Sequence, residues 1–507
     1  MRVQRKPVVV AAVAAALATA FAAAPAQAGN SNNSAKFRSA VTVAGIMHHL
    51  QQLQAVADAN GGNRAAGTSG YAASGDYVQG VLEAAGYTVT RQVFNIAYQA
   101  PGQLQQVSPN AVNYPTDSFT GSGAGDVTGT VRAVDLQLGL GNTSSSGCEA
   151  ADFAGFPAGS IALIQRGTCT FAVKAVNAQA AGARAAIIFN QGNTAAADRQ
   201  DLIVGTLNPS TAPITIPVVG GSYSNGVDLA DPPGTVARVF AAPIETRPTF
   251  NLLAETKTGR PDNIVMLGAH LDSVEAGPGI NDNGSGSASI LETAVQLAKV
   301  NKVNNKVRFA WWGAEEAGLL GSTHYVNDLV ANAPAELAKI ATYVNFDMVA
   351  SPNYQIGVYD ADQSTFPAPT GVPIPPGSIE TEDVLTDYFD SVGQPWVDTQ
   401  FSGRSDYQAF IVNGVAASGL FTGAEVPKPA EFVPLFGGTA GVAFDVNYHG
   451  AGDTIGNVNT TALDINSDAI AHLAITLAQS TESINGARSA GKSGNPHPIQ
   501  DGLQPAA

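Results

Sequence analysis

Cysteine is scarce in this chain. Only Cys148 and Cys169 occur among its 507 residues. In an exported protein, an isolated pair of this kind predicts a disulfide rather than a metal-binding or catalytic site. The scarcity of cysteine therefore argues against cysteine-based catalysis.

Basic residues and long apolar runs are scarce as well. The 25 Lys and Arg residues stand against 41 Asp and Glu residues, which gives a formal net charge of −16. Such a surface repels nucleic acid and anionic lipid. After the first 28 residues, no apolar stretch approaches the length needed to cross a bilayer. We therefore expect no nucleic-acid partner and, once the start of the chain is removed, no membrane association.

The start of the chain has the three parts of a secretory signal peptide. The basic segment MRVQRK is followed by an apolar run from Val8 to Ala24 and by small residues up to Ala28. A membrane anchor is the alternative, but the run is short and rich in alanine, and a cleavage site of the A-x-A type follows it. We expect cleavage after Ala28 and a secreted, extracellular protein.

The remaining chain is too long for one ordinary hydrophobic core, so more than one domain is expected. From residue 263 onward, apolar strand-like runs alternate with helical segments. The expected strands are 264–267, 307–312, 341–346 and 415–421, and the expected helices are 285–300, 316–330 and 466–482. This alternation predicts an α/β fold, a mostly parallel sheet flanked by helices.

Residues 125–245 interrupt that pattern. They carry strand and helix signals of their own, contain both cysteines, and have flanks rich in Gly, Ser and Pro, as expected at a domain boundary. The sequence therefore predicts an inserted domain of mixed α+β structure. The predicted division is a signal peptide at 1–28, the first part of the larger domain at 29–124, the insert at 125–245, the second part of the larger domain, which holds the candidate ligands and motifs described next, at 246–486, and a tail at 487–507.

Candidate ligands follow the expected strands, where the sites of open α/β sheets lie. They are His270, Asp282 in a Gly-rich loop, the adjacent pair Glu315 and Glu316, Asp347, and His449. Any one of them alone is a weak signal, because a single Asp or His at a strand end is usually a turn residue or a packed side chain. Together they form a nitrogen and oxygen ligand set that suits zinc, with one carboxylate left to bridge two ions.

The segments around these residues resemble a known family. They are HLDS at 270–273, GINDNGSG at 279–286, WWGAEEAGLLGS at 311–322, NFDM at 345–348 and YHGAGDT at 448–454. They are similar to the two-zinc aminopeptidases of the aminopeptidase Y and secreted bacterial leucine aminopeptidase type. The resemblance extends from about Val41 to Ile484 and implies the zinc-dependent exopeptidase fold.

The resemblance implies a role for each ligand. His270 and Asp347 would hold one Zn²⁺ ion, Glu316 and His449 would hold the second, and Asp282 would bridge the two. Glu315 would act as the general base, taking a proton from a water shared by the ions and passing it to the leaving amine. The expected substrates are peptides or proteins with free N-termini.

Further residues match positions around the site in that family. Tyr448 would donate a hydrogen bond to the developing oxyanion, with a packing role as the alternative. Arg404, in GRSDY at 403–407, would border the substrate amine, or else serve in an ion pair. Met348 and Phe421 would line an apolar specificity pocket, or else belong to the core.

Two more carboxylates and the insert complete the resemblance. Asp272 and Asp453 lie two and four residues from His270 and His449, and would orient those imidazoles. The insert resembles a protease-associated domain through GSIALI at 159–164 and RGTCTF at 166–171.

Three alternatives stay open from the sequence. A carboxypeptidase or a glutaminyl cyclase is built on the same scaffold, although a carboxypeptidase needs a cationic pocket and this chain is poor in Lys and Arg around its motifs. A binding module would have lost ligands, and none is missing here. A calcium site built from carboxylates is disfavoured by the two His ligands, while an additional calcium ion elsewhere stays open. We expect a monomer, although no residue bears on this.

Overall fold

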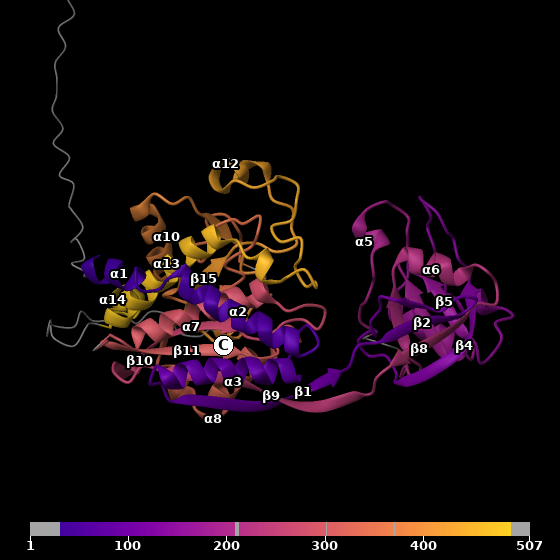
Figure 1. Ribbon diagram of the computed structural model, residues 1–507, viewed down its shortest axis with the longest axis horizontal. Helices are drawn as coiled ribbons and strands as arrows, with labels where there is room; N and C mark the ends of the chain where they lie inside the picture. Colours follow the sequence, from indigo (N-terminus) through magenta and orange to yellow (C-terminus); the bar gives the residue numbers. More distant parts are fainter. Residues whose placement is uncertain (1–30, 208–211, 301, 369–371, 488–507) are drawn as a thin grey trace, which may run out of the picture.

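The chain folds into two lobes that are joined by a long two-stranded ribbon (Figure 1). The computed structural model describes residues 31–207, 212–300, 302–368 and 372–487. The predicted signal peptide at 1–28 and residues 488–507 of the predicted tail lie outside these residues.

The larger lobe is built on an eight-stranded sheet. Its strands, in spatial order, are β1 (Val89–Gln99), β9 (Ile244–Glu255), β11 (Asn305–Trp312), β10 (Arg260–His270), β12 (Ile340–Asp347), β15 (Ala417–Phe421), β13 (Gly357–Tyr359) and β14 (Val397–Thr399). The central strand β10 runs parallel to β11 and β12, and β12 runs parallel to β15. Antiparallel pairs stand toward the edges, at β1–β9, β9–β11 and β13–β15. The predicted α/β fold is confirmed.

Helices cover both faces of this sheet. On one face lie α2 (Val43–Ala59), α3 (Ser69–Ala84), α7 (Gly286–Leu297), α10 (Ser378–Val392) and α13 (Thr460–Gln479). On the other lie α8 (Leu320–Asn332) and α11 (Tyr407–Val412). The remaining helices of this lobe are short: α1 (Ser31–Arg38), α9 (Pro334–Leu337), α12 (Val433–Phe436) and α14 (Glu482–Asn485).

The two covered faces explain why the central strands are apolar without interruption. Successive side chains of a strand point to opposite faces. On β10, Val265 and Leu267 pack into the core under α7 and α13, while Met266 packs into the core under α8 and α11. Because helices cover both faces of the sheet, neither face of the central strands contacts water. These strands can therefore be apolar at successive positions instead of alternating apolar and polar residues.

Two helices begin at other positions than predicted, and one of these differences matters for the site. Helix α8 begins at Leu320 rather than 316, so Glu315 and Glu316 lie in the loop that follows β11. Helix α13 begins at Thr460 rather than 466, because the Asn459 side chain accepts hydrogen bonds from the backbone N–H groups of Thr461 and Ala462.

The smaller lobe has a seven-stranded sheet. Its order is β3 (Val112–Tyr114), β2 (Gln103–Ser108), β8 (Val236–Ala241), β4 (Gly125–Val134), β5 (Ile161–Gln165), β6 (Ala185–Phe189) and β7 (Val218–Gly221). Helices α4 (Phe171–Ala180), α5 (Ala197–Gln200) and α6 (Tyr223–Ala230) belong to this lobe. Strands β4 to β7 are parallel and β8 is antiparallel to β2 and β4, which is the mixed structure predicted for the insert.

The smaller sheet begins earlier in the chain than the predicted insert. Strands β2 and β3 precede residue 125 but pair into this sheet. Strand β2 reads Gln-Leu-Gln-Gln-Val-Ser, in which the apolar residues Leu104 and Val107 fall on opposite faces and only Leu104 is buried. This strand carries too weak an apolar signal to be separated from a loop by sequence.

The predicted disulfide is present in the smaller lobe. Cys148 and Cys169 are bonded, with their Cα atoms 5.7 Å apart. The ammonium group of the fully buried Lys174 lies 3.7 Å from the Cys148 sulfur. Burial lowers the pKa of Lys174 to about 8.

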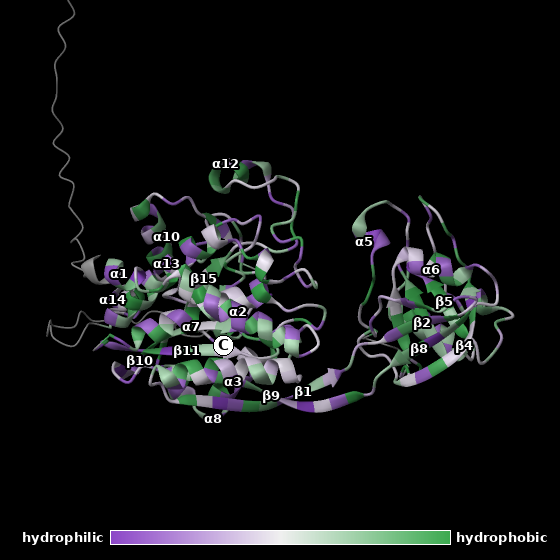
Figure 2. Cartoon of the chain, in the orientation of Figure 1, coloured by the Kyte–Doolittle hydropathy of each residue, from purple (hydrophilic) through white to green (hydrophobic). Residues whose placement is uncertain are grey.

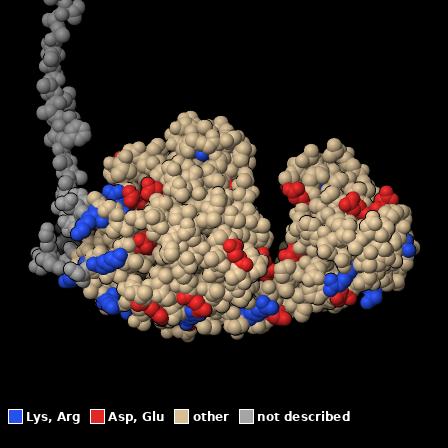
Figure 3. All heavy atoms as spheres, viewed as in Figure 1, with Lys and Arg blue, Asp and Glu red and all other residues tan. Residues whose placement is uncertain are grey.

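Figures 2 and 3 show where hydrophobic and charged residues lie in the structure. Helices such as α2 and α10 mix hydrophobic and hydrophilic residues along their length (Figure 2). The face drawn in Figure 3 shows scattered charges on a broad uncharged background, with a notch between the lobes. None of the helices in the described ranges is long and apolar enough to cross a membrane.

Candidate metal centre

The candidate ligands converge at the carboxyl ends of the central strands. His270 is the last residue of β10 and Asp347 is the last residue of β12. Glu315 and Glu316 lie just after β11, the parallel neighbour of β10. Because these ends meet at one edge of the sheet, side chains far apart in sequence face a common crevice.

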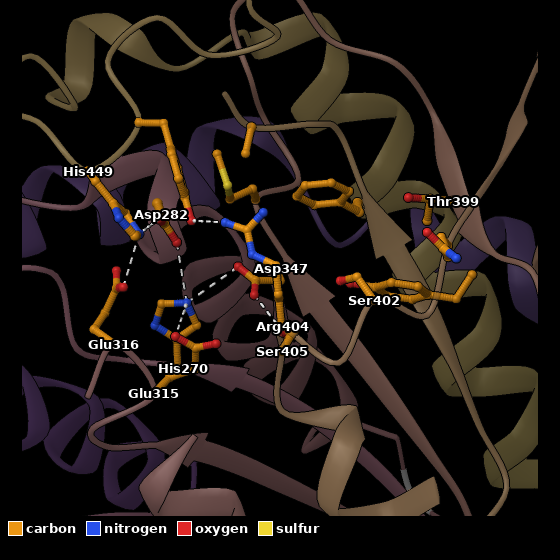
Figure 4. Close-up of a pocket in the computed structure, with 16 residues that line it drawn as sticks. His270, Asp282, Glu315, Glu316, Asp347, Thr399, Ser402, Arg404, Ser405 and His449 are labelled. Carbon is orange, nitrogen blue, oxygen red and sulfur yellow. Dashed lines mark hydrogen bonds and ion pairs between the residues drawn. The ribbon is translucent and has the colours of Figure 1, made fainter. Parts of the chain in front are cut away.

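Asp282 stands between two histidines. Its Oδ1 atom lies 3.3 Å from Nε2 of His270, and its Oδ2 atom lies 3.3 Å from Nε2 of His449 (Figure 4). The loop that carries Asp282 begins at Gly279, whose φ of 62° is a left-handed conformation that glycine adopts without strain. One carboxylate thus offers an oxygen to each of two positions.

Two groups of three side chains surround these positions. The first is His270, Asp282 and Asp347, and the second is Asp282, Glu316 and His449; in each, one ligand atom per residue lies within 4.8 Å of the others. His270 Nε2 is 3.4 Å from Asp347 Oδ1, and His449 Nε2 is 3.0 Å from Glu316 Oε2. All five predicted ligands are therefore brought together.

The ligand atoms fit metal ions. Glu316 Oε1 and Asp347 Oδ1 are buried and have no hydrogen-bond partner among the described residues, an arrangement that proteins avoid unless a cation or water satisfies the atom. Burial and the nearby Asp282 raise the pKa of Glu316 to about 7. Burial lowers the pKa of His449, but its hydrogen bonds to Asp282 and Glu316 raise it overall, to about 10. Imidazole nitrogens combined with carboxylate oxygens form a donor set that zinc accepts.

Glu315 lies beside the first group without belonging to it. Its Oε2 atom is 4.0 Å from His270 Nε2, and the residue is 8% exposed. Burial, together with Asp406, Asp347 and Glu316, raises the pKa of Glu315 well above its usual range. A carboxyl group of this kind is suited to exchanging a proton with a neighbouring substrate.

Asp272, which we predicted to orient His270, lies beside that ring and also contacts the two glutamates. Its Oδ1 atom is 3.7 Å from Nδ1 of His270, and its backbone carbonyl is 3.1 Å from the same nitrogen. Its two carboxylate oxygens also accept hydrogen bonds from the backbone N–H groups of Glu315 and Glu316, at 3.2 and 3.3 Å. One buried side chain therefore fixes both a ligand and the candidate base.

Asp453 has a different partner from the one expected. We predicted that it orients His449, because it follows that residue by four positions. Instead, its carboxylate accepts hydrogen bonds from the backbone N–H groups of Asn281 and Asp282, at 2.8 and 2.9 Å. The expectation was wrong because a short sequence separation in a loop does not determine where a side chain points. Asp453 holds the loop of the shared carboxylate.

Tyr448 and Arg404 lie together beside the second group. The ring of Tyr448 stacks on the His449 ring with centroids 3.8 Å apart, and its hydroxyl accepts a hydrogen bond from Arg404 Nη2 at 3.2 Å. Arg404 Nη1 also pairs with Glu425 Oε1 at 2.9 Å. Arg404 therefore lies beside the site and also makes an ion pair. These positions correspond to the two roles considered for it from the sequence, a contact with substrate and a structural ion pair.

A cavity of about 190 Å³ opens onto the ligands. Met348 and Phe421 are among its lining residues, as predicted. The sequence interpretation did not include several other lining residues, namely Tyr359, Thr399, Gln400, Ser402, Ser405 and Ala424. Most of them lie in the segment before α11, which has no strong periodicity of its own.

Two supporting residues were missed. The Ser405 hydroxyl donates to Asp347 Oδ2 at 2.6 Å and so orients that ligand. Arg64 is fully buried, and it donates from Nε to the Pro278 carbonyl at 2.9 Å and from Nη2 to the Gly279 carbonyl at 2.6 Å. Burial lowers the pKa of Arg64 to about 10. In the sequence, the only indication of this role was that Arg64 stands as a single charged residue in NRAAGT at 63–68.

Comparison with known proteins gives a consistent result. The model of peptidase family M28 matches residues 251–474, and the model of the PA domain matches residues 127–229. The chain is 51% identical over 448 residues to a Pseudomonas aeruginosa protein named aminopeptidase, covering 87% of this chain and 82% of that one. It is 47% identical over 358 residues to an Aspergillus fumigatus protein named probable leucine aminopeptidase 2, covering 69% and 68%.

The fold also resembles a solved structure. A zinc aminopeptidase from Bacillus subtilis superposes with a TM-score of 0.63 at 25% sequence identity. The match covers 85% of this chain and 94% of that one.

Proposed function

Because the chain belongs to peptidase family M28, we propose that it removes apolar, leucine-like residues from the N-termini of peptides at a centre of two zinc ions. The chain is a metallo-aminopeptidase of this family and carries a PA domain. The number of ions, the role of each residue and the substrate preference are the parts that we propose.

The observation that carries the two-ion proposal is the position of Asp282. Its two oxygens face His270 and His449 at the same distance of 3.3 Å. His270 and Asp347 would hold one zinc ion, and Glu316 and His449 would hold the other, with Asp282 shared. The buried oxygens of Glu316 and Asp347 that have no hydrogen-bond partner support this assignment. When bound, two zinc ions would lower the pKa of water and polarise the scissile carbonyl.

Glu315 would act as the general base. It would accept the proton of the attacking water at its carboxylate and then donate it to the leaving amine. Its burial and its position 4.0 Å from His270 Nε2 support this role. Asp272, which accepts hydrogen bonds from the backbone of Glu315 and Glu316, would keep the base aimed at the reaction.

Tyr448 would donate a hydrogen bond from its hydroxyl to the oxyanion that develops on the scissile carbonyl. Stacking on His449 and the hydrogen bond from Arg404 hold that hydroxyl in place. Burial raises the pKa of Tyr448 far above its usual range, so the hydroxyl keeps its proton at neutral pH. Arg404 would border the substrate at the mouth of the cavity.

Met348 and Phe421 would form the apolar wall that receives the N-terminal side chain. The cavity is small, at about 190 Å³, and it is bounded by four carboxylates that would attract the substrate's amine. The name of the Aspergillus relative, probable leucine aminopeptidase 2, points to the same preference.

The proposal also covers the location of the enzyme, its oligomeric state and an additional metal ion. We expect export by the signal peptide and action as an extracellular monomer. An additional calcium ion would find carboxylate oxygens at Asp360, Glu382 and Asp398, which lie within 4.8 Å of one another.

The test measures release of leucine from a Leu-anilide and a Leu-peptide. The purified protein is assayed as isolated, after chelation, and after zinc is added back, together with Glu315→Gln. The matched control is Glu431→Gln, which removes the same charge at an exposed position. We expect two zinc ions per chain, loss of activity on chelation and recovery with zinc. Glu315→Gln should retain zinc but lose activity by about 10²–10⁴-fold.

Other results would support the alternatives. Cleavage of C-terminal residues, or cyclisation of N-terminal glutamine, without release of leucine would favour a carboxypeptidase or a glutaminyl cyclase. A protein with neither zinc nor activity would be a binding module.

A further inference from the structure

The mouth of the cavity contains a single strong cation. Among the described residues that line the cavity, Arg404 is the only Lys or Arg. Its side chain is 60% exposed, so a substrate could reach it. An arginine at such a position is well suited to bind a carboxylate, because its planar guanidinium forms two parallel hydrogen bonds with the two oxygens.

That guanidinium is already engaged by the protein. Nη1 of Arg404 lies 2.9 Å from Oε1 of Glu425, and Nη2 donates to the Tyr448 hydroxyl at 3.2 Å. The hydrogen bond that Arg404 donates to Glu425 raises the pKa of Arg404. Glu425 stands in the loop after β15, and its side chain is 47% exposed. Each terminal nitrogen of Arg404 therefore already donates one hydrogen bond within the protein, and its charge is paired with that of Glu425.

The other charges of the cavity have the opposite effect on a carboxylate. Asp282, Glu315, Glu316 and Asp347 all line it. They favour an amine and repel an anion, apart from any metal that they hold. With two Zn²⁺ ions bound as proposed, most of these carboxylates would be engaged by metal, and Arg404 is the Lys or Arg of the described cavity lining that a substrate carboxylate could contact.

We propose that Glu425 is a specificity-determining residue: by pairing with Arg404, it withholds the cation of the cavity mouth from substrate carboxylates. The enzyme then recognises peptides by their amino end and gains nothing from a nearby carboxyl terminus. This inference rests on the proposed aminopeptidase function and deepens it. It also accounts for how a scaffold with an arginine at its mouth avoids selecting carboxylate-bearing substrates.

The test compares two substrates that differ only in the carboxyl terminus. Leu-Gly carries a free carboxylate one residue beyond the scissile bond, and Leu-Gly-amide does not. The measured quantity is the ratio of kcat/KM for Leu-Gly to kcat/KM for Leu-Gly-amide. Any effect of a substitution on folding, zinc content or the position of Tyr448 changes both values alike and cancels in this ratio.

We expect Glu425→Gln, which is nearly isosteric, to raise the ratio by about three- to fivefold, the size of one exposed ion pair. The rise should shrink in high salt, because exposed charges are screened. Glu431→Gln should leave the ratio unchanged, since it removes an equal charge from an exposed residue outside the cavity lining. Without Arg404 the substitution of Glu425 should have no effect. The ratio for the double variant Glu425→Gln/Arg404→Gln should therefore equal the ratio for Arg404→Gln.

The outcomes separate the two levels of the proposal. An active wild-type enzyme whose ratio is the same in Glu425→Gln, or whose ratio rises equally without Arg404, would overturn the role of Glu425 alone. Glu425→Ala repeats the test with a different side chain. A wild-type protein that cleaves neither Leu-Gly-amide nor a Leu-anilide would overturn the proposed function itself.

Discussion

Asp272 is one buried carboxylate that contacts several residues of the candidate metal centre. It approaches the imidazole of His270 and accepts hydrogen bonds from the backbone of Glu315 and Glu316. Residues that orient metal ligands typically change metal affinity when they are replaced, rather than the chemistry itself. The effect of Asp272 should therefore appear first in zinc binding.

We predict that Asp272→Ala weakens zinc binding by about 10–100-fold. Zinc affinity is measured by competition with a chelator, and leucine release is measured as a function of free zinc. Activity should return at high zinc, because the ligands themselves remain. The control is Asp262→Ala, at an exposed aspartate on β10, the strand that precedes Asp272. Unchanged zinc affinity with lost activity would contradict this role.

At the level of single residues, the sequence was informative wherever a side chain follows an apolar strand. His270, Asp347 and the Glu315–Glu316 pair could be located because the strand before each of them is recognisable. Ser405, Arg64 and Glu425 could not be assigned roles, because each acts on a partner far away in the chain. Such pairings depend on how loops meet in three dimensions, which local patterns do not encode.

At the level of elements, the central strands were predictable and the helix starts less so. Strands β10, β11 and β12 are apolar on both faces, so their signal is strong. Helix α10 was not predicted, because its exposed face carries Glu380, Asp383, Asp387 and Asp390, which weaken the apolar periodicity. Helices that lie on the surface of a sheet are stabilised by packing that the sequence only partly reveals.

Helices α1, α10 and α13 meet around His472. Its Nδ1 atom lies 2.6 Å from the Ser34 hydroxyl, and its ring stacks on Tyr388 with centroids 4.7 Å apart. Burial, together with the charge of Arg38, lowers the pKa of His472 to about 4. The unfolded chain therefore takes up a proton below about pH 6.5, whereas the folded protein resists it until about pH 4.

This difference makes the larger lobe less stable in acid. Between pH 6.5 and pH 4, the free energy of unfolding should fall by about 2 kcal/mol through His472. All three tryptophans, Trp311, Trp312 and Trp396, lie in the larger lobe, so their fluorescence during urea unfolding reports on it. His472→Phe keeps an aromatic ring and should flatten the pH dependence by that amount.

The exposed His48 provides the matched control for this prediction. His48→Phe should show the same pH dependence as the wild type. An equal fall in stability for His472→Phe and wild type would assign the acid sensitivity to other groups.

At the level of the whole molecule, the two lobes have separate cores. The residues of the smaller lobe form their own clusters, and none of the described residues that line the cavity at the candidate metal centre falls within 100–243. The ribbon that joins the lobes is the continuous pairing of β1 with β9, from Val89 opposite Ala254 to Gln99 opposite Ile244. The larger sheet therefore does not depend on the smaller lobe for its register.

We predict that the larger lobe folds when residues 100–243 are replaced by Asn-Gly. That dipeptide favours the tight turn of a two-residue hairpin, and Gln99 and Ile244 already face each other. The shortened protein should hydrolyse a Leu-anilide within about threefold of the full chain, as expected for a domain with its own core. Tryptophan fluorescence and zinc content check its folding.

A folded, zinc-loaded protein without activity on the anilide would show that the smaller lobe contributes directly to catalysis. Altered activity on long peptides alone would assign it to substrate access.

The ribbon also affects how the gene segment that encodes the smaller lobe can change. Both ends of the smaller lobe leave the larger lobe at two residues that face each other across one pair of strands. A single genetic event that removes or exchanges the intervening segment therefore leaves a hairpin in the ancestral sheet, with its catalytic edge untouched. Replacement of the accessory lobe would therefore leave the strands that carry the candidate metal ligands unchanged.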